Sequence, residues 1–439
     1  MQTYIEVPFI LGDGKSFPDG LIRVTRGQRQ WTALVEVKTG SNELKAEQLE
    51  RYLDIAREQG FDALITISNE VPPMAGQHPT RIDKRKLRKV ALHHIPWSEV
   101  LTVAVMQKEY RGVADPDQAW ILGELIRYLE HPKSGALEFD DMGPSWVPVR
   151  ESVSAGTLRP SDAAVPDIAG RFDALMRYAG LRLGRQLGTD VVPALTRKEL
   201  SEPMTRTQTL VSQLATTSSM TAALRIPGAV GTLSVTADLR AARITCHVDV
   251  EAPREGRPTT RVNWLVRQLK DAPETVRLES YAVHARGTGC AELLRVVREN
   301  PSTLIGDPTK ELRTFRVALT SIAGTKRGRG RGAFIDSVLD AIDDFYSQVI
   351  QNLKPWDARA SENAGVRVAA LGQERGPRRH DVAGPGAPRA GGGLVHRRPG
   401  RLNQPSINSD SARDPRVQRH RRAGDLFPSE RDQVHLPVR

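Results

Sequence analysis

The chain of 439 residues contains only two cysteines, Cys246 and Cys290. Two cysteines make neither a disulfide framework nor a zinc site built from cysteine ligands. The sequence also has no stretch that resembles a signal peptide and no apolar run of about eighteen residues. We therefore expect neither export nor membrane insertion, and we expect a cytoplasmic protein.

The last part of the chain lacks lysine and almost lacks aromatic residues. Residues 357–439 contain sixteen arginines, no lysine and one aromatic, Phe427, and they supply +7 of the formal net charge of +11. Such a segment buries too little apolar surface to offset its ordering entropy, so we expect a disordered Arg/Gly/Pro-rich tail. The abrupt change of composition after Trp356 is typical of a GC-rich gene translated in a shifted frame. The alternative is an arginine-rich arm that binds nucleic acid.

Length and composition indicate several cores before that tail. With 39% hydrophobic residues, the chain has enough apolar surface for two or three of them. The pattern of apolar residues and turns predicts an N-terminal domain over residues 1–110, a helical and linker region over 111–200, and an α+β unit over 205–356. A pI near 9.8 fits a polyanionic partner.

One predicted strand carries a carboxylate and an amine on the same face. In Leu34–Lys38, side chains alternate between the two faces of the strand, so Glu36 and Lys38 share one face. On the other face, Val35 and Val37 are expected to point into the apolar layer behind the strand.

A second carboxylate is brought to the same place by a hairpin. Leu21–Val24 predicts a preceding strand, joined to the next by a loop at Arg26–Gln30. Folding the hairpin about Gln28 places Asp19 opposite Val37, to within one or two residues. Asp19 is therefore expected to converge with Glu36 and Lys38.

A helix and two further strands complete the predicted N-terminal region. Asn42 or Ser41 is expected to cap a helix over residues 43–59 that carries Gln48 and stops at Gly60. Apolar stretches over 61–68 and 90–95 predict two more strands. His93 and His94 alternate across the last of them, so at most one faces any site, as a ligand or as an ordinary hydrogen-bonded sheet histidine.

This order of elements, with Pro18-Asp19, Glu36-x-Lys38 and the helical Gln48, resembles the PD-(D/E)XK nuclease superfamily, the fold of many restriction endonucleases. The resemblance covers about residues 1–110 and implies a mixed sheet flanked by helices. It implies that Asp19 and Glu36 bind the metal, that Lys38 is the catalytic lysine and that Gln48 is the helix residue of the RecB-like branch. Glu6 is a candidate for a further acid. The superfamily core usually opens with a helix, whereas here the first strand begins almost at Met1.

The residue types suit phosphodiester hydrolysis. Asp19 and Glu36 offer hard oxygen ligands for Mg2+ or Mn2+, which activates water and takes up charge on the phosphate. Lys38 adds a compact positive charge that orients the water and stabilises its hydroxide form. The basic run that includes Lys84, Arg85, Lys86, Arg88 and Lys89 is interpreted either as a grip on phosphates or as solvated surface.

The expected function is therefore that of a bacterial-type, magnesium-dependent nuclease acting on nucleic acid, with DNA favoured, in defence or in repair. The alternative is a catalytically inactive nuclease fold that binds nucleic acid or regulates another process. No membrane partner is expected. The C-terminal unit would serve a homodimer or a protein partner, or would sense a ligand or a feature of DNA.

The rest of the chain predicts helices, then an α+β unit. Apolar spacing predicts helices over residues 117–130 and 167–187, separated by a turn-rich linker over 135–166. The unit that follows is predicted to combine strands and helices. The strands are expected over 233–236, 244–250, 276–284 and 314–321, and the helices over 263–269 and 334–353.

Overall fold

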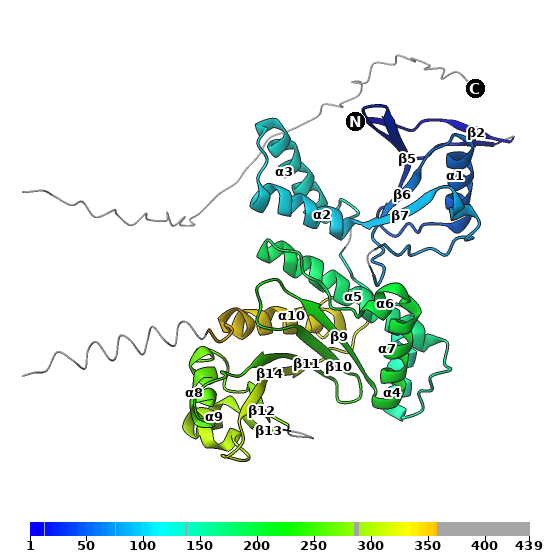
Figure 1. Ribbon diagram of the computed structural model, residues 1–439. Coiled ribbons are helices and arrows are strands. Elements are labelled where there is room, and N and C mark those ends of the chain that lie inside the picture. The colour runs from blue at the N-terminus through cyan, green and yellow to red at the C-terminus, as the bar shows by residue number, and fades with distance from the viewer. Residues whose placement is uncertain (13, 75, 137, 285–288, 358–439) are drawn as a thin grey trace, which may run out of the picture. The chain divides into compact units, whose positions relative to one another are not determined.

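The computed structural model describes residues 1–357, apart from positions 13, 75, 137 and 285–288. A mixed α/β N-terminal region is followed by helices and a second sheet (Figure 1), which confirms the predicted fold class at this level. The predictions of a disordered tail, a shifted frame or a basic arm concern the residues after Asp357. These residues lie outside the described part of the chain.

The N-terminal sheet has five strands in the order β1-β4-β5-β6-β7. The first three are antiparallel neighbours, whereas β5, β6 and β7 are parallel, so the sheet is mixed. A two-residue turn at Gly27 and Gln28 joins β4 to β5, and Gly27 supplies the positive φ of 60° that such a turn needs. The strands, with the separate hairpin β2–β3, are β1 Gln2–Ile5, β2 Phe9–Leu11, β3 Gly14–Ser16, β4 Gly20–Arg26, β5 Arg29–Val37, β6 Ala63–Ser68 and β7 Ala91–Pro96.

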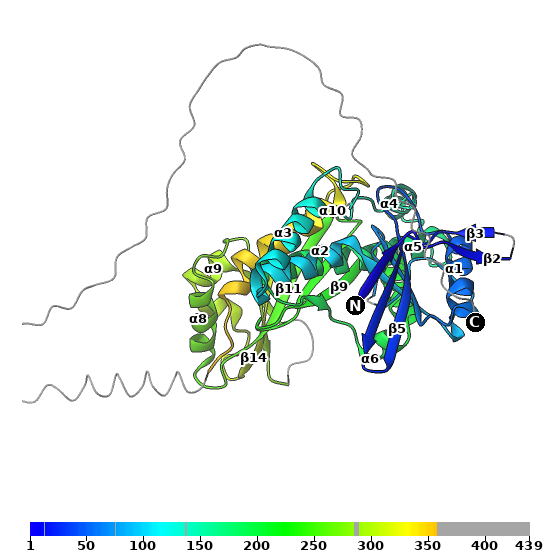
Figure 2. The same ribbon diagram turned by 90° about the horizontal axis from the view of Figure 1, so that it is seen from above.

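One helix, α1 (Ala46–Glu58), runs alongside this sheet (Figures 1 and 2). Its Leu49 and Leu53 are buried in one apolar cluster with Leu34 and Leu64 of the sheet. The helix ends before Gly60, whose φ of 68° confirms the predicted stop. It begins three residues later than expected, because the amide of Asn42 donates to the Thr39 carbonyl at 3.0 Å and closes a turn instead of capping the helix.

The predicted orientation of β5 was wrong. Leu34 and Glu36 face α1 and are 0% and 1% exposed, whereas Val35 and Val37 lie on the other face and are only half-buried. Alternation along a strand separates the two faces but does not tell which one a helix will cover. The apolar layer is therefore on the side of Glu36.

After β7 the chain forms three helical segments. These are α2 (Trp97–Val105), a π-helical turn (Met106–Arg111) and α3 (Pro116–Glu130), which packs against the first two. Asp115 caps α3 by accepting from the backbone N–H groups of Asp117 and Gln118. The predicted linker over 135–166 was wrong in part, because it contains the helix α4 (Trp146–Ala155).

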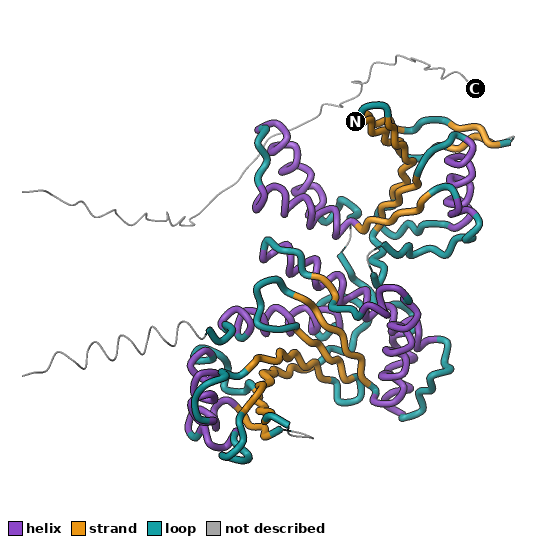
Figure 3. The backbone as a smooth tube through the Cα atoms, in the orientation of Figure 1, coloured by secondary structure: helices purple, strands orange, loops and turns teal. Residues whose placement is uncertain are grey.

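The second sheet has seven strands in the order β13-β12-β14-β11-β10-β9-β8, and neighbouring strands are antiparallel. Helices lie beside it (Figure 3). Pattern analysis missed β9 and the helix before it. The strands are β8 Val192–Pro193, β9 Ser219–Arg225, β10 Leu233–Asp238, β11 Arg243–Glu251, β12 Arg277–Ala282, β13 Cys290–Leu293 and β14 Leu312–Ile322, and the helices are α5 Ala164–Leu187, α6 Arg197–Ser201, α7 Pro203–Thr217, α8 Pro258–Gln268, α9 Leu294–Glu299 and α10 Phe334–Gln348.

The helices α4, α5, α7 and α10 share one buried apolar cluster with this sheet. A buried ion pair adds to it, since Arg206 on α7 donates to both carboxylate oxygens of Asp173 on α5, and to the Thr221 carbonyl at 2.9 Å. The cluster thus joins helices of the 111–200 region to strands of the 205–356 region. No helix among the described residues has the length and apolarity needed to cross a membrane.

Trp146 tests the contribution of α4 to this core. Its side chain is 0% exposed, packs against Phe334 with ring centroids 4.5 Å apart, and donates from Nε1 to the Thr325 carbonyl at 3.0 Å. Trp146→Ala should lower the free energy of unfolding by about 3–5 kcal/mol through the cavity that it leaves. Urea denaturation followed by circular dichroism measures the loss.

The matched control is Met204→Ala, because Met204 is 66% exposed. That substitution should change the free energy of unfolding by less than about 0.5 kcal/mol. Equal stabilities of the wild type and Trp146→Ala would contradict the assignment of α4 to the core.

Candidate functional site

Three elements bring Asp19, Glu36, Lys38 and Gln48 together at the carboxyl end of β5. Asp19 directly precedes β4, and Lys38 directly follows β5. The register pairs Gly20 with Val35, so Asp19 lies one position from its expected place, and its Oδ2 accepts from the Val37 backbone N–H at 2.7 Å. Gln48 lies in the first turn of α1 and donates to Glu36 Oε1 at 2.8 Å.

Glu36 is the centre of this cluster. Its side chain is 1% exposed, and its Oε1 also accepts from the Lys38 ammonium group. Burial raises the pKa of Glu36 above its ordinary value, Lys38 opposes that rise, and the nearby carboxylate of Asp19 adds to it. The cluster therefore combines two close carboxylates with one cation, in a partly dry environment.

The remaining carboxylate oxygens suit a divalent cation. Glu36 Oε2 is buried and has no hydrogen-bond partner among the described residues, although a buried carboxylate oxygen normally has one. Asp19 is exposed, so the cluster is open to solvent on its side. These oxygens fit Mg2+, which prefers hard oxygen ligands.

The donor set is small for other metals. Within the described ranges, no group of three or more His, Cys, Asp and Glu side chains is placed to hold a metal ion. Magnesium needs fewer protein ligands, because it usually keeps several waters and binds through one or two carboxylates and substrate phosphates. Asp19 and Glu36 meet that requirement.

Glu6, the further candidate acid, contacts this region only through its backbone. Its N–H donates to the Asp19 carbonyl at 3.3 Å, and it follows β1 with an unusual positive φ of 51°. Its side chain is exposed and makes no hydrogen bond to the described residues. The structure thus places Glu6 near Asp19 in the backbone without bringing its carboxylate into the cluster.

The basic run lies at the other end of the sheet. Lys84, Arg85, Lys86, Arg88 and Lys89 precede β7, whereas the strand position aligned with Glu36 is His94. His94 lies five positions after Lys89, which is about 16 Å along an extended chain. Lys86 is paired with Asp54 of α1 at 2.5 Å. The structure therefore does not bring this run to the four-residue cluster.

Sequence reasoning assigned no role to Tyr52. Its hydroxyl accepts from Gln48 Nε2 at 3.1 Å and donates to the Phe17 carbonyl at 3.2 Å. Tyr52 thus connects the glutamine that holds Glu36 to the segment that carries Asp19. The available signal was its spacing, because residues four apart on a helix share a face.

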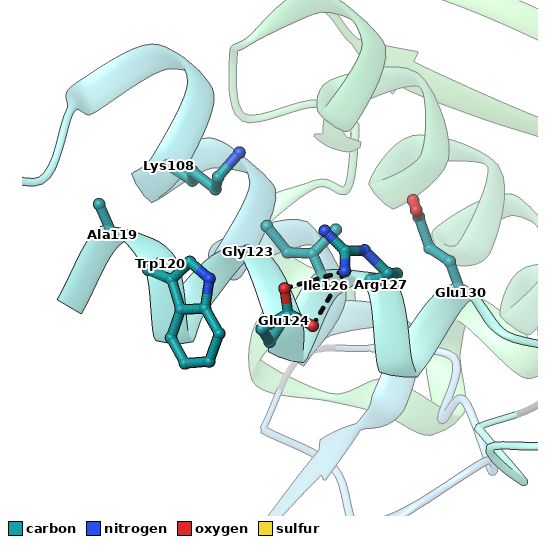
Figure 4. A pocket seen from close by; sticks show the side chains of 8 residues that line it. All are labelled: Lys108, Ala119, Trp120, Gly123, Glu124, Ile126, Arg127 and Glu130. Carbon is teal, nitrogen blue, oxygen red and sulfur yellow. Dashed lines mark hydrogen bonds and ion pairs between the residues drawn. The ribbon is translucent and has the colours of Figure 1, made fainter. Parts of the chain in front are cut away.

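A hollow of about 390 Å³ lies elsewhere, against α3 and Lys108 (Figure 4). Its lining includes Trp120, Glu124 and Arg127, and it contains none of the four residues of the cluster. We therefore treat the carboxylate cluster, and not this hollow, as the candidate site.

Comparison of the chain with family models, with curated proteins and with solved structures finds no match. The resemblance to nucleases thus depends on Asp19, Glu36, Lys38 and Gln48, and on the order of the elements that carry them.

A buried histidine network lies beside the cluster. His94 is 7% exposed, its Nδ1 is 2.9 Å from Thr66 Oγ1, and its Nε2 is 2.8 Å from the Glu70 carbonyl. His78 Nε2 is 3.0 Å from the same hydroxyl, and His78 Nδ1 accepts from the Thr80 backbone N–H. These contacts are all satisfied when both rings are neutral and Thr66 donates to His94. His94 is a hydrogen-bonded sheet histidine in this arrangement.

This network predicts a pH dependence of stability. Burial lowers the pKa of His94 to about 4, whereas an unfolded histidine titrates near about 6.5. The unfolded chain therefore binds the proton first, and the contribution of His94, about 3 kcal/mol, is present above pH 6.5 and lost as the pH falls from about 6.5 to 4. Urea denaturation across this range measures it.

His94→Gln removes the titrating group and should flatten the fall in stability over that window. His131→Gln is the control, because His131 is exposed on the surface. If His94→Gln and the wild type lose stability with the same slope, His94 is not held neutral in the folded protein.

Proposed function

We propose that this protein is a metal-dependent nuclease of the PD-(D/E)XK type that hydrolyses phosphodiester bonds of nucleic acid, with DNA as the favoured substrate. The observation that carries the proposal is the buried carboxylate of Glu36. One of its oxygens is held by Lys38 and Gln48, and the other has no partner among the described residues. A protein that only bound nucleic acid would have no physical reason to keep such a carboxylate beside Asp19.

Each residue has a defined part in this proposal. Asp19 and Glu36 would hold the divalent cation, which when bound activates water and takes up negative charge on the phosphate. Lys38 orients the attacking water and stabilises its hydroxide form. Gln48 orients Glu36, and Tyr52 fixes Gln48 through the Phe17 carbonyl.

The deciding experiment is a cleavage assay with the full chain. Labelled duplex and single-stranded DNA and RNA are incubated with magnesium, with manganese or with EDTA. Cleavage that requires the metal supports the nuclease. Binding without cleavage of any of these substrates, under all metal conditions, would instead favour the inactive binding protein.

Lys38→Ala should reduce cleavage at least about 100-fold, because it removes a charge that acts in the transition state. Lys270→Ala is the matched control, because Lys270 is exposed and lies in the C-terminal unit, after α8. Substrate affinity, measured by fluorescence anisotropy, should change little in either variant. Equal turnover by Lys38→Ala and the wild type would show that another residue performs this step.

Asp19→Asn and Glu36→Gln should weaken magnesium binding, since each removes a charged oxygen ligand while keeping the side-chain size. Isothermal titration calorimetry of the purified protein with magnesium chloride measures this affinity directly. Asp62→Asn is the control, because Asp62 lies on the surface and bonds the Thr32 backbone N–H at 2.7 Å. Unchanged affinity in both site variants would place the metal elsewhere.

A further inference from the structure

No second layer of the described residues covers one apolar face of the N-terminal sheet. We call this the outer face and define it by Ile22, Trp31, Val35, Ile65, Ile67 and Ile95. The register sets them side by side, with Val35 next to Ile65 and Ile67 next to Ile95. None of the six is buried, and none belongs to or packs on the two apolar clusters of the described residues.

The open face of the second sheet is polar, whereas the outer face of the N-terminal sheet is apolar. On the side away from its buried cluster, that sheet carries Thr236, Thr245, Asp249 and Thr320, with hydrogen bonds such as Thr245 to Thr320 at 2.9 Å. A polar open side is normal for an antiparallel sheet with one solvated face. The outer face is apolar instead, so it has the composition of a sheet that another layer covers.

Helix α3 offers a complementary surface. Its Trp120, Ile121, Leu125 and Tyr128 are all exposed, Trp120 by 68%. Figure 4 shows the Trp120 ring projecting from the helix, and the same ring lines the hollow that Lys108 also lines. The helix has 15 residues and is about 22 Å long, and the nine-residue strand β5 is about 30 Å long. The helix therefore fits along the strands.

The charges beside the two surfaces are opposite. Arg26 and Arg29 face each other across the β4–β5 hairpin, on the same side as Trp31, and no acidic residue occurs from Gly20 to Val35. Helix α3 and its cap carry four acids, including Asp117 and Glu124, against one arginine. An acidic helix laid on the outer face would thus meet the basic hairpin.

We infer that the outer face binds α3 of a second copy of this chain, and that the second copy receives α3 of the first in the same way. This exchange has twofold symmetry and pairs both surfaces in both copies. Trp120 and Tyr128, 68% and 60% exposed, bring roughly 200–300 Å² of ring surface per copy. The aliphatic side chains and the sheet surfaces that they cover add to this area. The total surface buried by the two contacts then approaches the roughly 1,200–2,000 Å² of a stable interface.

The oligomeric state of the full chain tests the inference. Sedimentation equilibrium across a wide range of concentration should give the mass of two chains for the wild type. Trp120→Glu and Ile65→Glu, one on each surface, should each give the mass of one chain. The control Ile322→Glu should remain a dimer, because Ile322 is 82% exposed on β14 and lies on neither surface. A wild type that stays monomeric at every concentration would overturn the inference, as would dissociation by the control alone.

A charge exchange tests which surfaces meet. One variant carries Arg26→Glu and Arg29→Glu, and the other carries Asp117→Lys and Glu124→Lys. In a dimer of either variant alone, like charges would lie opposite each other at both contacts. Each variant alone should therefore be monomeric at low ionic strength. Mixed in equal amounts they should form a heterodimer, because the changed face meets the changed helix and the unchanged face meets the unchanged helix.

The same mixture excludes the rival arrangement, in which α3 folds onto the sheet of its own chain. In that arrangement both partners of each contact lie in one chain, so mixing changes nothing. A mixture that keeps the mass of one chain overturns the inference. Circular dichroism of each variant confirms that it is folded before mixing.

Discussion

The N-terminal region is organised around one carboxylate, that of Glu36, which lies within the layer between a sheet and a helix. Removing a carboxylate from water costs several kcal/mol unless partners replace the lost hydration. Here Lys38 and Gln48 hold one oxygen, and Tyr52 fixes Gln48 in turn. The packing of α1 on the sheet and the order of the cluster thus depend on each other, because Gln48 and Tyr52 share that helix with the buried Leu49 and Leu53.

The two sheets differ in the polarity of the face that their helices leave open. The seven-stranded sheet packs its helices on one side and presents threonines and charged residues on the other. The five-stranded sheet carries the carboxylate of the candidate site on its covered face, and isoleucines with Val35 on its outer face. Since water solvates the first arrangement well and the second poorly, the two surfaces are suited to different surroundings. The same strand, β5, contributes Glu36 to one side and Val35 to the other, so the candidate site and the outer face share one backbone.

Local sequence signals predicted that Asp19, Glu36 and Lys38 would converge, and the structure places them together. Pro18-Asp19 and Glu36-x-Lys38 depend on strand parity and on a short hairpin, and Gly60 marks the end of α1 by its positive φ. These features follow from neighbours a few residues apart. Alternation alone did not tell which side of β5 is buried. A rule that places apolar residues inside would bury Val35 and expose Glu36, whereas the structure buries Glu36 and leaves Val35 half-buried. The sequence patterns also did not predict α4 and β9. The apolar residues of these elements pack against residues far away in the chain, as Trp146 of α4 does against Phe334.

The sequence by itself determined the residue types of the site, the approximate strands and helices, and the absence of a disulfide framework, because each follows from local spacing or from composition. Only the tertiary structure decided that Glu36 is buried while Asp19 is exposed, and that the basic run before β7 lies at the far end of the sheet. It also decided which face of the N-terminal sheet no other described element covers. The physical reason is that burial, pKa and the pairing of charges depend on which surfaces meet, and those meetings join residues far apart in the chain.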